Sequence, residues 1–405
     1  MEELKLTFVN VGYGEAALLE CPDPAFPGGT FVMVIDGGSA EAEEYRDSAT
    51  GRIPLDQYLS LRGVDHIDLM AATHVHEDHL CGLLPAAEKL PPAALWQTLP
   101  PEFCRSMRTL DIPAEGLTPS RSKFLRALND YRRLCLGQSC PRHRPLAGME
   151  LRLCRDLLVR VLGPSRAQAE KLASSCRALY EEADPSAFWQ RLDQLDAAMN
   201  NYSLILLLEY RGTRILLPGD TNYMGYGGLD PASLRADLFK VGHHGSDTST
   251  TLDLIGWFAP QVAVIEVGAG NDYGLPSQET LDELAYWGVQ TWRTDVDGTV
   301  AVQSDGATAT AWAIDTGATQ PLDPAVVATY PTEADLAQMP AESEPAPVEE
   351  VPAVQEPVGV TVYVTETGNK YHGGGCRYLK SSKIPIDRDA AIAQGYAACK
   401  VCGGC

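Results

Sequence analysis

The sequence predicts a mixed α/β fold of the α+β kind, with sheets that are covered on their outer sides by helices. Short apolar runs separated by turn residues fill residues 5–36, which is typical of paired strands. Later, strand-like runs such as QVAVIEVG alternate with helix-like runs such as SQETLDELAYWG. Paired strands followed by strand–helix alternation favour a mixed sheet system with outer helices.

Each element follows from its local pattern. LKLTFVNVGYGEAALLECP predicts strand, glycine-rich turn and strand, and FVMVIDGG predicts a third strand that ends at Asp36. PLDQYLSLRGV predicts a helix, and IDLMAAT predicts a strand that leads into THVHEDH. SRSKFLRALNDYRRLCL predicts a basic helix, and YSLILLLEY with TRILLPGD predicts a hairpin. Further strands are expected in ADLFKVGHHGS, VQTWRTD and GTVAVQS.

The chain divides into three predicted parts. Its 405 residues exceed what one ordinary core contains, so one large domain and a smaller one are expected. Residues 316–358 are rich in Pro, Ala and Glu and contain no Lys or Arg, which predicts an extended acidic linker. We therefore expect a hydrolase-like domain at 1–315, the linker, and a small module at 359–405.

Sequence pattern and composition predict the cellular compartment of the protein. No window approaches about 20 uninterrupted apolar residues, so no transmembrane helix is expected. The start MEELKLTFVNVG lacks a basic region followed by an apolar one, so no signal peptide is expected. Eleven unevenly spaced cysteines fit reduced thiols better than a disulfide framework. These features predict a cytoplasmic protein.

The net charge of −22 excludes a generic nucleic-acid coat, because phosphates would be repelled. Positive charge is nevertheless concentrated locally. Residues 105–160 hold twelve Arg or Lys against five Asp or Glu, and residues 359–405 hold six against three. The first of these stretches either flanks a polyanion groove or is a solvated helix face.

His74, His76, Asp78 and His79 fall within six residues at the end of a predicted strand. Histidines two apart on an extended segment point the same way, so His74 and His76 can bind one ion. Asp78 and His79 follow where the chain turns and can reach a second ion nearby. Imidazoles with a carboxylate suit Zn²⁺, Mn²⁺ or Fe²⁺.

The pattern H-x-H-x-D-H-x-x-G, which ends at Gly82, resembles the signature of the metallo-β-lactamase superfamily. FVNVGYGEAALLE, VIDGG, NNYSLILLLEYRGTRILLPGD, DLFKVGHHGSDTST and GNDYGLPSQETL are similar, in that order, to blocks of the ComEC-like hydrolase domains within it. The resemblance covers roughly residues 3–312. It implies a four-layer αββα sandwich with a two-metal site, occupied by Zn or Mn, at the sheet edges.

The resemblance also implies roles for individual residues. Expected metal ligands are His74, His76, Asp78, His79, Asp220, His243 and His244. Among them Asp78, Asp220 and His244 are expected to act in catalysis. Expected substrate contacts are Asn201, Ser203, Lys240 and Ser246. For Lys240 an ordinary surface position is the favoured alternative, and for Ser246 a turn cap is at least as favoured.

Two departures from the family pattern stand out. Leu275 precedes Pro276 where the similar domains usually carry His, so a one-metal or weakened site is one alternative. In the first turn, Tyr13 and Glu15 stand where the similar sequences usually read D-V-G-Q-G-D.

The C-terminal module carries His372, Cys376, Cys399 and Cys402, with the spacing of a structural zinc site. YHGGGCRYL and GYAACKVC resemble the zinc-binding module of the Ada DNA-repair protein, with His372 in place of the first Cys. So small a module needs such a staple to fold well. Contact with DNA or RNA and a role as a folding cap or protein-docking module remain equal alternatives.

These patterns predict a metal-dependent hydrolase, foremost a phosphodiesterase or nuclease that uses metal-bound hydroxide on nucleic acid or a nucleotide derivative. One alternative is hydrolysis of small thioester or lactone-type acyl substrates, because folds of this kind serve both chemistries. The other is a catalytically weakened nucleic-acid-binding protein. DNA or RNA is the candidate partner, and no stable protein partner is identified.

Overall fold

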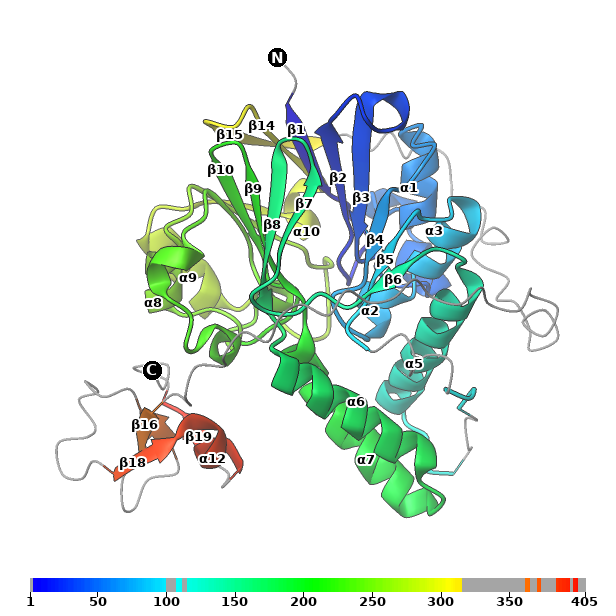
Figure 1. Cartoon of the computed structure of the whole chain (residues 1–405), viewed down its shortest axis with the longest axis vertical. Coiled ribbons are helices and arrows are strands. Elements are labelled where there is room, and N and C mark those ends of the chain that lie inside the picture. The colour runs from blue at the N-terminus through cyan, green and yellow to red at the C-terminus, as the bar shows by residue number, and fades with distance from the viewer. Residues whose placement is uncertain are drawn as a thin grey trace.

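The structure is a computed structural model of the chain (Figure 1). It describes residues 3–99, 107–110, 115–314, 361–364, 370–372, 384–393 and 396–399. The predicted linker at 316–358 lies outside the described residues, so the domain boundaries stay a prediction.

The first of two large sheets is formed mainly by the N-terminal third of the chain. Its strands lie in the order β15-β14-β1-β2-β3-β4-β5-β6 among the described residues. The strands β15, β14, β1, β2 and β3 are antiparallel neighbours, and β3 to β6 run parallel. Their bounds are β1 (Leu4–Phe8), β2 (Ala17–Pro22), β3 (Thr30–Ile35), β4 (Leu69–Ala71), β5 (Leu95–Trp96), β6 (Arg142–His143), β14 (Thr299–Ser304) and β15 (Ala309–Ile314).

The second large sheet is formed by the C-terminal half of the predicted hydrolase domain. Its order is β13-β12-β11-β10-β9-β8-β7. The expected hairpin is confirmed, because β9 and β10 pair antiparallel, and β10 to β13 run parallel. The bounds are β7 (Glu150–Cys154), β8 (Leu157–Gly163), β9 (Ile205–Tyr210), β10 (Thr213–Leu217), β11 (Leu238–Lys240), β12 (Val262–Ile265) and β13 (Gln290–Arg293).

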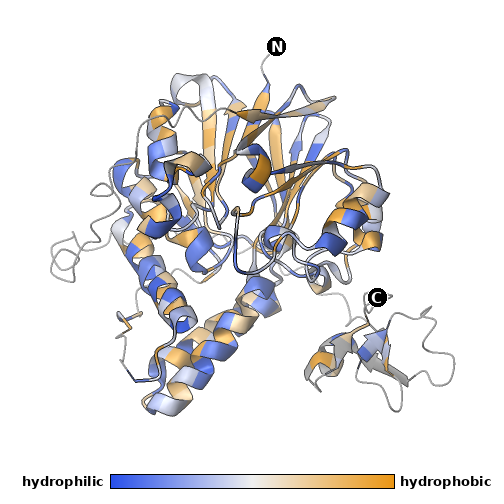
Figure 2. Ribbon diagram, turned by 180° about the vertical axis from the view of Figure 1, so that it is seen from behind, coloured by the Kyte–Doolittle hydropathy of each residue, from blue (hydrophilic) through white to orange (hydrophobic). Residues whose placement is uncertain are grey.

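Three apolar cores divide the molecule into four layers. One face of each sheet packs on the other sheet, with Leu6 and Met33 opposing residues such as Leu206. The outer face of the first sheet packs on α1 (Leu55–Leu61), α3 (Leu83–Lys89) and α5 (Pro119–Gly137). The outer face of the second packs on α8 (Leu252–Phe258) and α9 (Gln278–Tyr286). Figure 2 shows hydrophobic residues concentrated on the strands. The predicted αββα arrangement is confirmed.

Between β8 and β9 the chain forms two helices that the sequence patterns above did not predict. They are α6 (Arg166–Glu181) and α7 (Pro185–Ala198), which project together away from the sheets (Figure 1). Ser165 and Gln168 form a capping box at the start of α6, and Asp184 caps α7. Their apolar faces join the core beside the first sheet. No helix in the described part of the chain combines the length and hydrophobicity that a membrane span requires.

The C-terminal residues that the structure describes form a small sheet in the order β18-β16-β17-β19. The elements are β16 (Thr361–Val364), β17 (Lys370–His372), β18 (Ile384–Asp387), α12 (Arg388–Ala393) and β19 (Ala397–Ala398). Val362 and Tyr371 belong to its apolar cluster, against which Tyr223 and Met224 of the large domain pack. The Arg388 guanidinium donates a hydrogen bond to the carbonyl oxygen of Met224, at 3.2 Å.

The fold brings strand ends from both sheets to one edge. The segments that follow β3, β4, β10, β11 and β12 carry Asp36, the 74–79 cluster, Asp220, His243–His244 and Glu266 respectively. All five strands are parallel to a neighbour, and carboxyl ends of parallel strands are where such sheets bind ligands. The candidate site therefore lies at this edge.

Candidate metal centre

Close backbone packing positions the short helix α2 (Glu77–Leu80), which carries Asp78 and His79. The Gly37 N–H donates to the carbonyl oxygen of His79 at 2.7 Å, and the Gly82 N–H donates to that of Gly38 at 2.9 Å. A Cβ at Gly82 would overlap the carbonyl of Gly37. The glycine that ends the histidine motif therefore lets α2 approach the end of β3 closely enough to aim its side chains into the site.

His74 and His76 form the first set of candidate ligands. Nε2 of His74 lies 3.1 Å from Nδ1 of His76. His74 Nδ1–H donates to the Thr73 hydroxyl at 3.0 Å, which directs Nε2 towards His76. Burial and the neighbouring imidazoles of His79 and His76 hold the pKa of His74 well below its usual value. His74 is therefore neutral, which is the form that binds a metal ion.

Asp78, His79, His244 and Asp220 form the second set. Asp220 Oδ2 lies 3.2 Å from Nε2 of His79 and 3.6 Å from Nε2 of His244. Asp78 Oδ2 accepts a hydrogen bond from His244 Nε2 at 3.1 Å. The ring centroids of His74 and His79 are 4.2 Å apart, so the two sets adjoin. The structure thus brings together residues that are up to 170 positions apart in sequence.

Both imidazoles of the second set are oriented from behind. His79 Nδ1–H donates to Asp36 Oδ2 at 2.9 Å, and His244 Nδ1–H donates to the Glu266 carbonyl at 2.9 Å. Asp36 is itself held by the backbone N–H and the hydroxyl of Thr73, at 2.7 and 2.6 Å. With Nδ1 occupied, Nε2 of each ring faces the carboxylates, which is the usual arrangement behind metal-binding histidines.

The residues present fit a divalent metal ion. Asp220 Oδ1 is buried and lacks a hydrogen bond in the described part of the chain, whereas the equally buried His79 Nε2 faces Asp220 Oδ2 at 3.2 Å. Buried polar atoms of this kind are costly unless something satisfies them. Imidazole nitrogens and carboxylate oxygens are ligands that zinc and manganese accept. The second set alone offers two imidazoles and two carboxylates.

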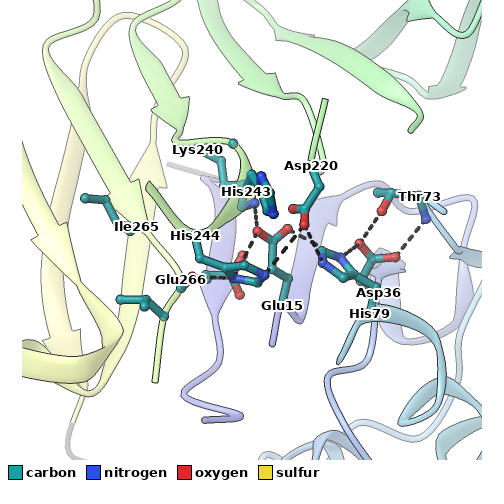
Figure 3. A network of polar contacts seen from close by, with 12 residues as sticks. Glu15, Asp36, Thr73, His79, Asp220, Lys240, His243, His244, Ile265 and Glu266 are labelled. Carbon is teal, nitrogen blue, oxygen red and sulfur yellow. Dashed lines mark hydrogen bonds and ion pairs between the residues drawn. The ribbon is translucent and has the colours of Figure 1, made fainter. Parts of the chain in front are cut away.

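Glu15 lies between His244 and His79 and joins a buried charge network (Figure 3). The ligand atoms of Glu15, His79, Asp220 and His244 all lie within 4.8 Å of one another. The distances from Glu15 are nevertheless to the rear nitrogens, 3.6 Å to His79 Nδ1 and 3.7 Å to His244 Nδ1. Since both rear nitrogens already have acceptors, we place Glu15 behind the imidazoles, where it adds negative charge.

Lys240 is the counterion of Glu15. It is only 3% exposed, so it is not the surface lysine that the sequence allowed. Its ammonium pairs with the Glu15 carboxylate. Glu266, which accepts a hydrogen bond from the Ala16 N–H at 2.9 Å, lies nearby, and burial raises its pKa to about 8. Burial also raises the pKa of Glu15, to about 6 against the opposing charge of Lys240, so the Lys240–Glu15 pair is mostly ionised at neutral pH.

His243 and His244 both adopt left-handed backbone conformations, with φ of 49° and 52°. Such strain in non-glycine residues concentrates at functional sites. His243 Nε2 accepts a hydrogen bond from the Asn200 amide at 3.3 Å. Asn200, one position before the predicted Asn201, is thus the asparagine that reaches the histidine pair, while Asn201 accepts a hydrogen bond from Asn222.

The other predicted substrate residues lie close by but are engaged within the protein. Ser203 Oγ accepts a hydrogen bond from the Asp220 N–H at 3.3 Å. Ser246 Oγ accepts one from the Thr248 N–H at 3.2 Å, as a turn cap does. Leu275 packs against the apolar core beneath α8 and α9. Substrate contact by Asn201, Ser203, Lys240 and Ser246 stays a prediction.

Several site residues were not predicted as such from the sequence. Asp36 had a signal, since VIDGG places an acid at a strand end. Glu15 and Glu266 had weak ones, as single acids after apolar runs. Asp196 had none, because α7 itself was not predicted; its Oδ1 lies 3.2 Å from His76 Nε2.

Several basic side chains of the stretch 105–160 form internal ion pairs. Arg121 pairs with Asp193 at 2.6 Å and Arg133 with Asp130 at 2.9 Å. Further pairs join Arg126 to Glu41 and Arg160 to Glu150. The side chains described here therefore give no support to a polyanion groove along this stretch.

The two described residues of the predicted zinc site lie side by side. The Cys399 N–H donates to the Tyr371 carbonyl at 2.9 Å, and Tyr371 pairs with Ala398 across the sheet. His372, the last residue of β17, therefore lies beside Cys399, the residue directly after β19, and both are buried. Cys376 and Cys402 lie outside the described residues.

The chain is similar to proteins connected by name with competence and recombination. It is 25% identical over 309 residues to ComE operon protein 3 of Bacillus subtilis (strain 168), which covers 74% of this chain and 33% of that protein. It is 30% identical over 105 residues to Recombination protein 2 of Haemophilus influenzae, covering 26% of this chain and 13% of that protein. The chain thus spans a third or less of the length of these relatives. No protein-family model matches it.

Among solved structures, a putative metal-dependent hydrolase from Parabacteroides distasonis is similar at a TM-score of 0.36 and 13% identity, covering 72% of this chain and 93% of that one. A diphosphatase from the PhnP family is similar at a TM-score of 0.37 and 11% identity, covering 74% and 97%. We draw no argument from likenesses of this strength.

Metal binding is predicted to release protons. Burial lowers the pKa of His244, but Asp220 and Asp78 outweigh it and raise that pKa to about 9. The carboxylates of Asp220, Glu15 and Asp78 likewise overcome burial and raise the pKa of His79 well above its usual value. Both rings are thus protonated in the metal-free protein at pH 7.5. Calorimetric titration with Zn²⁺ in buffers of different ionisation enthalpy should show proton release, and affinity should fall as the pH is lowered.

The matched variants are His244→Gln, which should release fewer protons, and His66→Gln, which should behave as the wild type because His66 lies beside Thr30 at the opposite, amino end of β3. Zn²⁺ binding with no proton release in any buffer would contradict this account of the second ligand set.

Proposed function

We propose that the chain is a metal-dependent hydrolase that cleaves phosphodiester bonds in nucleic acid or a nucleotide derivative. The observation that carries the proposal is the convergence of two adjoining ligand sets around Asp220, whose Oδ1 is buried without a hydrogen bond in the described part of the chain. Pairs of divalent ions about 3.5–4 Å apart are the usual solution for this reaction.

In this proposal His74 Nε2 and His76 Nδ1 would hold one ion, and Asp78, His79 and His244 would hold the other. Asp220 would be available to both sets, because its Oδ2 lies 3.2 Å from His79 Nε2 and its buried Oδ1 has no hydrogen bond in the described part of the chain. Ions bound there would lower the pKa of a bound water and neutralise charge on the phosphate.

Neighbouring charged groups keep the carboxylates of the site ionised. His79, the hydrogen bond from His244 and the charge on His244 together overcome burial and hold the pKa of Asp78 well below its usual value, so it is ionised. Direct contact of Lys240 with substrate would require it to leave Glu15. We therefore propose that Lys240 acts through Glu15, by keeping that carboxylate ionised behind both imidazoles.

Substrate contact is assigned to the more accessible groups. His243 and Asn200 lie at the less buried side of the site, and the Ser246 and Thr248 hydroxyls can donate to phosphate oxygens. One relative is named for recombination, which favours nucleic acid over a small acyl ester. The complete second ligand set, formed without a histidine at 275, favours catalysis over binding alone.

Asp220→Asn is predicted to reduce hydrolysis at least about 100-fold, because it removes the charge that the two ligand sets share. The measurement is cleavage of labelled single- and double-stranded DNA and RNA with Mn²⁺ or Zn²⁺. Circular dichroism should show a folded variant.

The exposed Asp253→Asn is the matched control and should keep full activity. Equal turnover by wild type and Asp220→Asn would overturn the site. Turnover of a small thioester or lactone, with none of the nucleic acids, would move the assignment to the acyl-hydrolase alternative.

We also propose that the C-terminal module holds a structural zinc ion on His372, Cys376, Cys399 and Cys402. Its support is the register of β17 and β19, which sets His372 beside Cys399 with both side chains buried. A tetrahedral site with one imidazole and three thiolates suits zinc.

For this module, Cys402→Ser in the full chain should lower the bound zinc by about one equivalent relative to wild type, measured by mass spectrometry of the metal after identical dialysis. Cys140→Ser, in the large domain, should retain the wild-type content. Equal zinc in wild type and Cys402→Ser would refute the site.

A further inference from the structure

Three aromatic rings form a column that runs from the second ligand set to the protein surface. The Tyr13 ring lies 4.7 Å from that of His244, centroid to centroid. Tyr273 stacks on Tyr13 at 4.7 Å with an interplanar angle of 16°. Tyr273 is 63% exposed. One face of Tyr273 therefore packs on Tyr13, and much of the remaining side chain is open to solvent. Only the Tyr13 ring separates Tyr273 from His244, a candidate metal ligand.

The column joins loops from both sheets, and the structure holds both loops in place. The Tyr13 N–H donates to Glu44 Oε2 at 3.2 Å. In the other loop the Asn271 side chain accepts from the N–H groups of Tyr273 and Leu275, each at 3.1 Å. Loops closed by such bonds present their side chains with little further loss of conformational freedom.

Arg52 ties the two loops to each other. Its Nη1 pairs with Glu44 Oε2 at 3.1 Å, and its Nη2 donates to the Ala269 carbonyl at 2.7 Å. The turn that carries Tyr13 and the loop that carries Tyr273 are thus fixed relative to one another. The ring column is preorganised in this structure, as a binding platform must be.

We propose that Tyr273 and Tyr13 form a stacking platform for an unpaired nucleobase next to the phosphodiester that the metal centre cleaves. This inference rests on the proposed function and names its substrate class: single-stranded nucleic acid, or a nucleotide that carries a base beside the scissile phosphate. Stacking on aromatic side chains is how proteins bind single-stranded nucleic acid without reading its sequence. A base within a duplex already stacks on its neighbours and cannot offer its face.

The net charge of the protein is consistent with recognition of nucleic acid by aromatic stacking and not by a row of basic side chains. The chain carries a net charge of −22, and several arginines of its most basic stretch pair with acids. A protein with this net charge repels a long row of phosphates. Neutral ring stacking at Tyr273, together with one phosphate at the metal centre, gives a footprint of a few nucleotides.

The test is calorimetric binding of a phosphorothioate tetranucleotide, which resists cleavage, to the Mn²⁺-loaded full chain, compared with the same oligomer lacking one base beside the central linkage. Tyr273→Ala should weaken binding of the intact oligomer about tenfold and leave binding of the abasic oligomer unchanged. Tyr273→Phe, which keeps the ring, should bind as the wild type does. Tyr286→Ala, at an exposed tyrosine on α9, is the control for loss of any surface tyrosine.

Equal binding of intact and abasic oligomers by wild type would overturn the platform, and so would equal loss in Tyr273→Ala for both. Tighter binding of duplex than of single strand would overturn it as well. Base-dependent binding without turnover of any phosphodiester would keep the platform and overturn the proposed hydrolysis, so the two failures are distinguishable.

Discussion

Burial of negative charge at one edge of the two sheets is the constraint on which the rest of the site depends. Asp36, Asp78, Asp220 and Glu15 all lie within this network, and Asp36, Asp220 and Glu15 are almost entirely buried. Carboxylates in such a place must be compensated by cations or donors. The histidines, Lys240 and the Thr73 hydroxyl supply part of that compensation. Asp220 Oδ1, which the described protein groups leave without a hydrogen bond, indicates that a further cation belongs there.

The packing of the four layers fixes the positions of the residues at this edge. The candidate ligands lie in segments that follow strands, and Lys240 is the last residue of β11. The two apolar faces packed between the sheets fix the strand ends relative to each other. Backbone contacts then set the finer geometry. Gly82 and Gly37 allow α2 to lie against the end of β3, so that His79 meets both Asp36 behind it and Asp220 in front. The inserted α7 adds Asp196 from outside the sandwich, next to His76.

Much of this could be predicted from the sequence. The period of the apolar residues located most strands. The histidine motif, together with the resemblance of the GD and HHGS blocks, pointed to residues that the structure brings to one edge of the sheets. The features that the sequence did not predict depend on contacts between residues far apart in the chain. Lys240 gives no sign in sequence of its partner, since Glu15 is 225 positions away. The rings of Tyr13 and Tyr273 stack only because two loops from different sheets meet. The α6–α7 pair escaped because it lies in a region of mixed polar and apolar residues between two predicted elements.

The most direct test of the central claim, that this edge holds two divalent ions, is anomalous diffraction from crystals of the full chain grown with Mn²⁺. The account predicts two peaks about 3.5–4 Å apart, one between His74 and His76 and one among Asp78, His79 and His244, with Asp220 in contact with both. Manganese bound elsewhere, or an Asp220 that contacts neither ion, would contradict it.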